Sequence, residues 1–166
     1  MNYLRLTVFL SLGCILIGCA EQPARVATSS GSRRIQKVRT TAYSRGERGG
    51  SRNAVDSFLS NRRVRSAASD WSRYPLGTRF RIANTSEEYV IDDYGTALVG
   101  TNTIDLYKPT RLEMKRWGVR HVDIDILQWG SEEQSLKVLK ARSKHRMVRR
   151  MILALQKKTS PNRAID

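Results

Sequence analysis

Aspartates in the middle of the chain are the residues best suited to chemistry. Asp93 precedes a tight turn at Gly95, and Asp105 follows between two apolar residues, Ile104 and Leu106. Aspartate is disfavoured in the centre of a strand, so such a residue marks a strand edge, a hydrogen bond to a turn, or a site. Two neighbouring carboxyl groups can give and take protons as general acid and general base. Residue types alone leave these possibilities open.

The remaining reactive residue types restrict the chemistry further. Both cysteines lie within the first nineteen residues, so the rest of the chain can form neither a disulfide nor a thiolate metal site. Two histidines are too few for a zinc centre. Asp123 and Asp125 share one face of an alternating segment, where a metal site is conceivable but a solvated face is the commoner explanation. We therefore expect no metal and no cofactor.

Charge and composition point to a globular protein with an anionic partner. The chain has 166 residues, 40% of them hydrophobic and 27% charged, which is typical of one folded domain. Thirty Lys and Arg oppose fifteen Asp and Glu, which gives a net charge of +15. Such an excess favours nucleic acid, a lipid surface or a polyanionic polymer as partner.

The N-terminus has the pattern of a lipoprotein signal peptide over residues 1–18. An apolar run of about eleven residues is too short to span a bilayer. It ends in Leu16, Ile17, Gly18 and Cys19, which resembles the bacterial lipobox and implies lipidation of Cys19. The alternatives are a plain secretory signal cut elsewhere, or an N-terminal anchor. Because Ala20 stands where an aspartate would mark inner-membrane retention, we expect an outer-membrane anchor that faces the periplasm.

Export changes the expected partners. A basic protein outside the cytoplasm rarely meets nucleic acid, but it does meet lipid head groups and the carboxylates of peptidoglycan. We therefore expect peptidoglycan and, through Cys19, the membrane as partners, and no nucleic acid. The sequence does not determine the oligomeric state.

Hydrophobic alternation predicts short strands at 38–43, 78–82, 89–92, 102–107 and 121–127. A helical turn is expected at 55–59. A short helix is expected at 109–117, because Thr110 and Glu113 have capping-box spacing and Gly118 is a natural stop. Short strands interrupted by glycine and proline favour a closed β-barrel over a βαβ sheet.

Two further segments flank the predicted barrel domain of residues 37–130. Residues 19–36 are rich in small polar residues and are expected to form a flexible tether. In residues 131–166, Ser131 and Gln134 form a second capping box, which opens one predicted helix to about residue 158. This basic amphipathic helix can lie on a membrane, or it can pack on the barrel with its charges in water. The second arrangement is slightly favoured.

Six short blocks occur in the order of a known family. They are Thr41-Ala42-Tyr43, Ala68-Ser69-Asp70, Pro75-Leu76-Gly77-Thr78, residues 93–100, Ile104-Asp105-Leu106-Tyr107 and Trp117-Gly118. Together they resemble the three-aspartate (3D) domain of the membrane-bound lytic transglycosylase A family and of resuscitation-factor-like cell-wall enzymes. The resemblance implies a mainly β fold, a six-stranded double-psi β-barrel with a short helix, here followed by the basic C-terminal helix. The three aspartates of the family would be Asp70, Asp93 and Asp105.

The resemblance also implies an activity on peptidoglycan. Lytic transglycosylases cleave the bond between N-acetylmuramic acid and N-acetylglucosamine, and the muramyl C6 hydroxyl closes on its own C1 to leave a 1,6-anhydro end. Since the attacking hydroxyl is already tethered to the substrate, one acid that later acts as base can suffice. The alternative is a non-catalytic peptidoglycan-binding double-psi barrel lipoprotein.

The implied roles fall on six residues. Asp105 would be the acid and base, and Asp93 would orient it or raise its pKa. Asp70 would be structural and bond turn backbone. The polar side chains of Thr41, Tyr43 and Thr78 would contact sugar.

Overall fold

The computed structural model describes residues 33–45 and 51–159. The predicted signal peptide, Cys19 and most of the predicted tether lie outside the described residues. The elements follow in the order β1 (Arg33–Tyr43), β2 (Val64–Ser69), β3 (Arg79–Ile82), β4 (Glu88–Tyr94), the 3-10 helix η1 (Thr96–Leu98), β5 (Thr103–Tyr107), α1 (Arg111–Trp117), β6 (Arg120–Gln128), α2 (Glu132–Lys140) and α3 (Arg146–Thr159).

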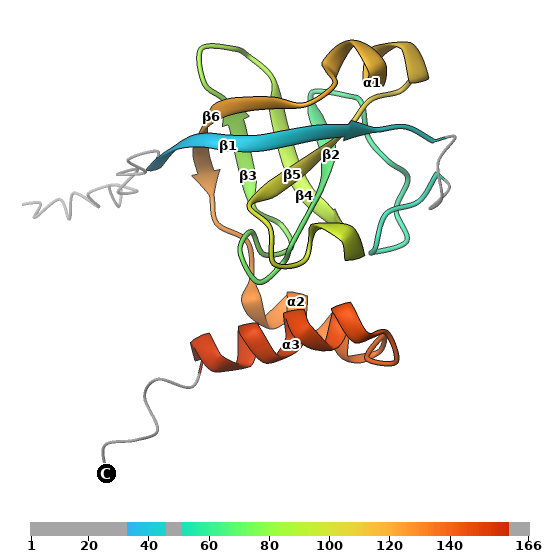
Figure 1. Cartoon of the computed structure of the whole chain (residues 1–166), viewed down its shortest axis with the longest axis vertical. Coiled ribbons are helices and arrows are strands. Elements are labelled where there is room, and N and C mark those ends of the chain that lie inside the picture. The colour runs from blue at the N-terminus through green and yellow to red at the C-terminus, as the bar shows by residue number, and fades with distance from the viewer. Residues whose placement is uncertain (1–32, 46–50, 160–166) are drawn as a thin grey trace, which may run out of the picture.

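The six strands form a closed barrel in the order β1-β5-β2-β4-β3-β6 (Figure 1). The pairs β1–β5 and β2–β4 are parallel, and the other four pairs are antiparallel. The predicted mainly β fold with a six-stranded barrel is confirmed, and two parallel pairs within one closed barrel fit the double-psi arrangement. Closure also removes exposed strand edges.

The barrel interior is filled by the apolar positions that alternate along the strands. Ile104 and Leu106 of β5, Ile91 of β4 and Ile124 of β6 are fully buried, which agrees with the period of two expected for strands. Their burial fixes the register, because a slip of one residue would turn the polar face inward. Asp105, between two inward residues, is therefore directed to the outside of the barrel.

Three local features differ from the expectations. Strand β2 has no counterpart among the predicted strands, because its residues Val-Arg-Ser-Ala-Ala-Ser include few strong strand formers. Strand β1 begins at Arg33, within the predicted tether. The segment expected to be a helical turn at 55–59 is instead a turn that closes an isolated bridge between Arg52 and Phe58.

The N-cap hydrogen bond of each predicted capping box is present. The hydroxyl of Thr110 accepts a hydrogen bond from the backbone N–H of Glu113 at the beginning of α1, and Gly118 ends that helix with a φ of 60°. The hydroxyl of Ser131 accepts from the N–H of Gln134 at the beginning of α2. These local signals were readable because a cap and its helix lie within a few residues.

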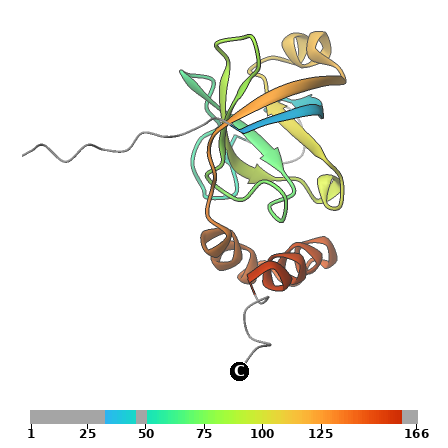
Figure 2. The same cartoon turned by 90° about the vertical axis from the view of Figure 1, so that its left-hand side faces the viewer.

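The C-terminal segment forms two helices instead of the one that was expected. The chain turns at 141–145, and His145 Nδ1 accepts a hydrogen bond from the N–H of Met147, 3.2 Å away, in the first turn of α3. Helices α2 and α3 lie side by side below the barrel (Figures 1 and 2). The break lets Leu139 of α2 and Met151 of α3 both join the hydrophobic core. One straight helix could not bury both residues on the barrel.

These contacts confirm that the basic segment packs on the barrel. The Ser135 hydroxyl of α2 accepts a hydrogen bond from the backbone N–H of Leu76 at 2.9 Å. Among residues 33–45 and 51–159, no helix is both long and apolar enough to cross a membrane.

Candidate functional site

Two of the predicted aspartates lie in one row across the barrel wall. Thr41 of β1 pairs with Asp105 of β5, Asp105 pairs with Ala68 of β2, and Ala68 pairs with Asp93 of β4. Side chains at paired positions of neighbouring strands share a face of the sheet. Strands are about 4.8 Å apart, so the backbones of Asp105 and Asp93 are about 10 Å apart, with only the methyl group of Ala68 between them.

A β-bulge adds a third carboxyl group to this face. Pairing between β2 and β4 shifts after Ala67, so Asp92 is an extra residue opposite Ala68. Asp92 Oδ2 accepts hydrogen bonds from Ser66 Oγ at 2.6 Å and from Asn53 Nδ2 at 2.9 Å. Because Ser66 and Ala68 are two residues apart on β2, they point to the same face. The bulge therefore places Asp92 and Asp93 on one side of the sheet.

Burial makes these neighbouring carboxyl groups easier to protonate. The pKa of Asp92 is raised by desolvation, which outweighs its hydrogen bonds from Ser66 and Asn53. The pKa of Asp93 is raised to about 6, first by desolvation, with the nearby charge of Asp92 acting in the same direction. At near-neutral pH, Asp93 thus has both protonation states within reach, as a group that transfers protons requires.

The position of Asp93 is held through its backbone as well as its side chain. Its carbonyl accepts a hydrogen bond from the indole Nε1 of Trp71 at 2.8 Å, and Trp71 is fully buried. Asp93 Oδ1 accepts from the N–H of Tyr94 at 2.9 Å, and the N–H of Ala54 also bonds to this carboxyl group. These hydrogen bonds fix the position and the direction of the Asp93 carboxyl group.

On the other side of Ala68, the carboxyl group of Asp105 is oriented by Thr41. Thr41 Oγ1 donates to Asp105 Oδ1 at 2.6 Å, a short distance typical of a bond to a carboxyl group. The structure therefore places Thr41, Asp105 and Asp93 in one row. It places Thr41 as a partner of Asp105; contact of Thr41 with sugar stays a prediction.

Tyr43 lies beside the carboxyl groups. Its ring centroid is 5.6 Å from that of Tyr107, and its hydroxyl oxygen is covered, with no hydrogen-bond partner within the described part of the chain. Burial raises its pKa, and the charges of Asp93, Asp92 and Asp105 raise it further. The phenol is therefore neutral and holds a proton that it can donate. Direct contact with sugar stays a prediction for Tyr43.

Asp70 lies apart from this row and bonds the turns around it. It is almost fully buried, and its Oδ1 accepts from the N–H and the hydroxyl of Ser72 at 2.9 and 2.7 Å. Its Oδ2 accepts from the N–H of Gly100 at 2.7 Å. The expected bonds to turn backbone are thus present.

The prediction that Thr78 contacts sugar is wrong. Thr78 is fully buried, and its hydroxyl donates to the carbonyl of Pro75 at 2.7 Å. The same oxygen accepts from the N–H of Gly130 at 3.0 Å. The hydroxyl therefore uses both its donor and its acceptor to join the turn to the segment that follows β6.

The carboxylates of β6 are occupied by neighbours on β1. Arg34 Nε and Nη2 donate to the two oxygens of Asp125 at 2.8 and 3.1 Å, and Asp123 Oδ1 accepts from the N–H of Lys37. In the described segments, no group of three or more His, Cys, Asp or Glu residues could hold a metal ion.

The site also has members that the sequence analysis did not single out. In a regular strand, adjacent residues face opposite sides, so nothing in the sequence indicated that Asp92 joins Asp93. Asn53 and Ala54 belong to the loop before β2. Arg142, in the turn between α2 and α3, donates from Nη2 to the Ala54 carbonyl at 2.7 Å, with its guanidinium 5.8 Å from the centre of the Tyr94 ring. The C-terminal helices therefore contact the loop that bonds Asp93.

Comparison with known proteins agrees with this architecture. Residues 65–128, from β2 to the end of β6, match the family model of the 3D domain. This range covers the three strands β2, β4 and β5 of the site row, and Thr41 of β1 precedes it.

One solved structure to which the chain is similar is a variant of the E. coli lytic transglycosylase MltA in an apo form. The sequence identity is 22% and the TM-score is 0.36, over 48% of this chain and 28% of that chain. The similarity therefore spans less than a third of the length of that protein. No curated protein matches this chain.

Proposed function

We propose that this protein is a peptidoglycan lytic transglycosylase, which cleaves the bond between N-acetylmuramic acid and N-acetylglucosamine and leaves a 1,6-anhydro end. The observation that carries the proposal is the row of Asp105, Ala68 and Asp93 on the outer face of the barrel. Two carboxyl groups on one face of the sheet are separated by a single small residue. The match to the 3D domain supports the same assignment.

In the proposed reaction, the carboxyl group of Asp105 gives its proton to the glycosidic oxygen. The bond from C1 of the muramyl residue to that oxygen breaks, and the C6 hydroxyl oxygen of the same sugar bonds to C1. Asp105, now a carboxylate, accepts the C6 hydroxyl proton and is restored. No water is consumed, because the nucleophile belongs to the substrate, and so the water-activating carboxylate or carboxylate nucleophile of an ordinary glycosidase is not needed.

The neighbouring groups have supporting roles in this proposal. The hydroxyl of Thr41 holds Asp105 by the 2.6 Å hydrogen bond and fixes the direction of its carboxyl group. The charge of Asp93 adjusts the pKa of Asp105 from the other side of Ala68. Because the pKa of Asp93 is itself raised, Asp93 can be neutral or ionised as the proton moves. The phenol of Tyr43, among the three carboxyl groups, supplies a proton donor.

The test is to incubate the purified protein with peptidoglycan sacculi and to identify soluble products by mass spectrometry. Wild type should release anhydro-muropeptides, and Asp105→Asn should lower the rate by about 10²–10⁴-fold, the usual worth of a well-placed acid or base. Asp56→Asn is the matched control, because its side chain is 85% exposed. Retained sacculus binding without products from wild type would instead favour a non-catalytic wall-binding module.

The proposed location is the cell envelope, with a lipid on Cys19 and the barrel facing the periplasm from the outer membrane. This rests on the sequence pattern that ends at Cys19 and on the net charge of +15, which suits an anionic wall and lipid surface.

A further inference from the structure

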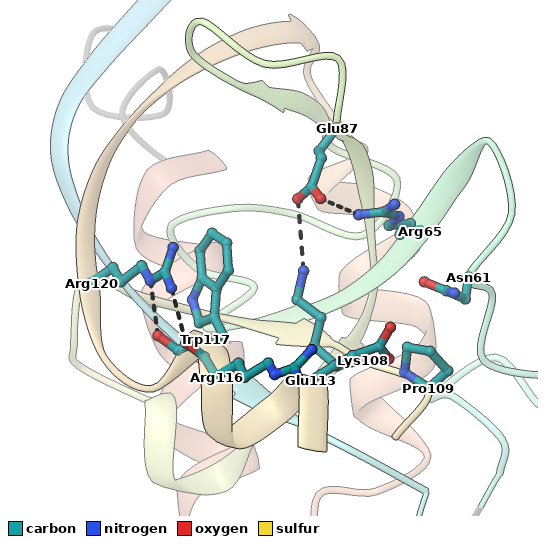
Figure 3. Close-up of a pocket in the computed structure, with 9 residues that line it drawn as sticks. All are labelled: Asn61, Arg65, Glu87, Lys108, Pro109, Glu113, Arg116, Trp117 and Arg120. Carbon is teal, nitrogen blue, oxygen red and sulfur yellow. Dashed lines mark hydrogen bonds and ion pairs between the residues drawn. The ribbon is translucent and has the colours of Figure 1, made fainter. Parts of the chain in front are cut away.

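A hollow lies at the end of the barrel that α1 covers, apart from the aspartate row. It has a volume of about 250 Å³, and its lining includes four basic and two acidic side chains (Figure 3). The basic residues are Arg65, Lys108, Arg116 and Arg120; the acidic residues are Glu87 and Glu113. The ring of Trp117 and Pro109 add an apolar wall.

Lys108 is the residue that most clearly points to a ligand. Its side chain is 9% exposed, and its Nζ lies 4.5 Å from the centre of the Trp117 ring. Within the described residues, the ammonium group makes one hydrogen bond, to Tyr89 Oη at 2.8 Å, and Glu87 is farther away at 3.7 Å. An ammonium group has three N–H donors, so this buried cation has donors left for a group inside the hollow.

The charges around Lys108 are not balanced by the protein. Glu87 forms an ion pair with Arg65, and the same carboxylate is the nearest counter-charge of Lys108. The Arg116 guanidinium has no hydrogen bond or ion pair with any residue that the structure describes. The lining as a whole carries a net charge of +2, and partial burial strengthens the attraction of this charge for an anion.

The lining favours a carboxylate over a phosphate. Two glutamates in the wall would repel a dianion more strongly than a monoanion. The Trp117 ring and Pro109 offer apolar contact to the carbon atoms that carry a carboxylate. A volume of about 250 Å³ admits such a group with part of its chain, and not a whole disaccharide.

We propose that this hollow binds a carboxylate group, with the peptide stem of peptidoglycan as its source, or else a free small acid. The assignment to the stem rests on the function proposed above. Lys108 is three residues beyond Asp105, about 10 Å along the chain at the rise of a strand. Because Asp105 faces outward and Lys108 lines the end of the barrel, a stem attached to a sugar beside Asp105 would have to extend around the barrel rim to reach Lys108.

The test uses the full chain labelled with ¹⁵N and four probes: the stem peptide released from sacculi, the same peptide with its carboxylates amidated, sodium acetate, and sodium phosphate. The Nε1–H signal of Trp117 reports on the hollow, and that of Trp129, which stacks on Tyr74 away from it, is the internal control. The free stem peptide should shift the Trp117 signal and leave the Trp129 signal in place. The amidated peptide should shift neither signal.

Two variants and a control follow from the lining. Lys108→Met should weaken binding by about 10- to 100-fold, through loss of a hydrogen bond from a charged group. Arg116→Gln should weaken it by about 2- to 5-fold, and because Arg116 is exposed, this variant tests the site even if Lys108→Met does not fold. Lys115→Gln removes the same charge from α1 outside the hollow and should bind like wild type.

Each outcome decides between the alternatives. If acetate binds as tightly as the stem peptide, the carboxylate site stands, and a free small acid is its ligand. If phosphate binds more tightly than both, if the amidated peptide binds equally well, or if no probe shifts Trp117, the proposal is overturned. The stem peptide contains no glycosidic bond, so this result is independent of whether sacculi are cleaved.

Discussion

Replacing Asp93 with asparagine should stabilise the protein at neutral pH. A carboxyl group whose pKa is raised by folding is easier to protonate in the folded state than in the unfolded state, where its pKa is close to the ordinary 3.8. Below pH 3.8 both states hold the proton and the carboxyl group has no net effect. Between pH 3.8 and about 6, the wild type loses stability as pH rises, because the folded state must either keep a proton or bury a charge.

The magnitude follows from the size of the pKa shift. Each pKa unit corresponds to about 1.4 kcal/mol, so a shift from 3.8 to about 6 destabilises the ionised wild type by at most about 3 kcal/mol. Screening by solvent at this partly exposed carboxyl group reduces the expected effect to about 2 kcal/mol. In the wild type, the N–H of Tyr94 donates to Asp93 Oδ1 at 2.9 Å. The amide of Asp93→Asn does not ionise, and its oxygen can still accept this hydrogen bond.

The assay is urea unfolding followed by circular dichroism from pH 3.5 to pH 8. The variant and the wild type should be nearly equal in stability at the lowest pH, and the variant should be more stable by about 2 kcal/mol above pH 6.5. Asp56→Asn, at an exposed position, should follow the wild type at every pH. A variant that is less stable than wild type at pH 7, or a difference that does not change with pH, would refute the reasoning.

Three further predictions concern the surroundings of the site. Arg142→Gln should raise the midpoint of the Asp93 titration in NMR, because the Arg142 charge lowers the pKa of Asp93; an unchanged midpoint would show that the guanidinium does not influence Asp93. Leu139→Ala, at a fully buried position that joins α2 to the barrel core, should lower the free energy of unfolding by about 2–5 kcal/mol in urea; Leu153→Ala, 66% exposed on α3, is its control. Cys19→Ala should abolish incorporation of a fatty-acid probe in cells, and equal labelling of wild type and variant would contradict lipidation at Cys19.

Much of the fold was determined by local patterns in the sequence. The alternation of Ile104, Leu106 and Ile124 with polar residues identified strands because side chains on a strand point alternately to its two faces. Thr110 and Ser131 marked the beginnings of helices because a cap and the N–H that it bonds are three residues apart. The order of the six motif blocks was enough to indicate the 3D domain and to single out Asp93 and Asp105 as candidates.

The tertiary structure decided which of these residues meet and which do not. Thr41 and Asp105 are separated by 63 residues of chain and become neighbours only through the parallel pairing of β1 with β5. The bulge that brings Asp92 to the side of Asp93 arises where the pairing of β2 with β4 shifts, and no alternation within β4 reveals it. Thr78 looked like a surface hydroxyl, but the segment after β6 returns to cover it.

The same distinction applies to burial and charge. The number of basic residues was visible in the sequence, whereas the burial of Lys108 beside Trp117 depends on α1 closing the barrel end. The raised pKa of Asp93 likewise depends on the burial that the fold imposes on this carboxyl group and on the nearby charge of Asp92. The sequence determined which groups can ionise, because ionisable chemistry belongs to the side chain. Only the fold decided what ionisation costs, because that free energy depends on the solvent and charges that long-range contacts bring to or exclude from each group.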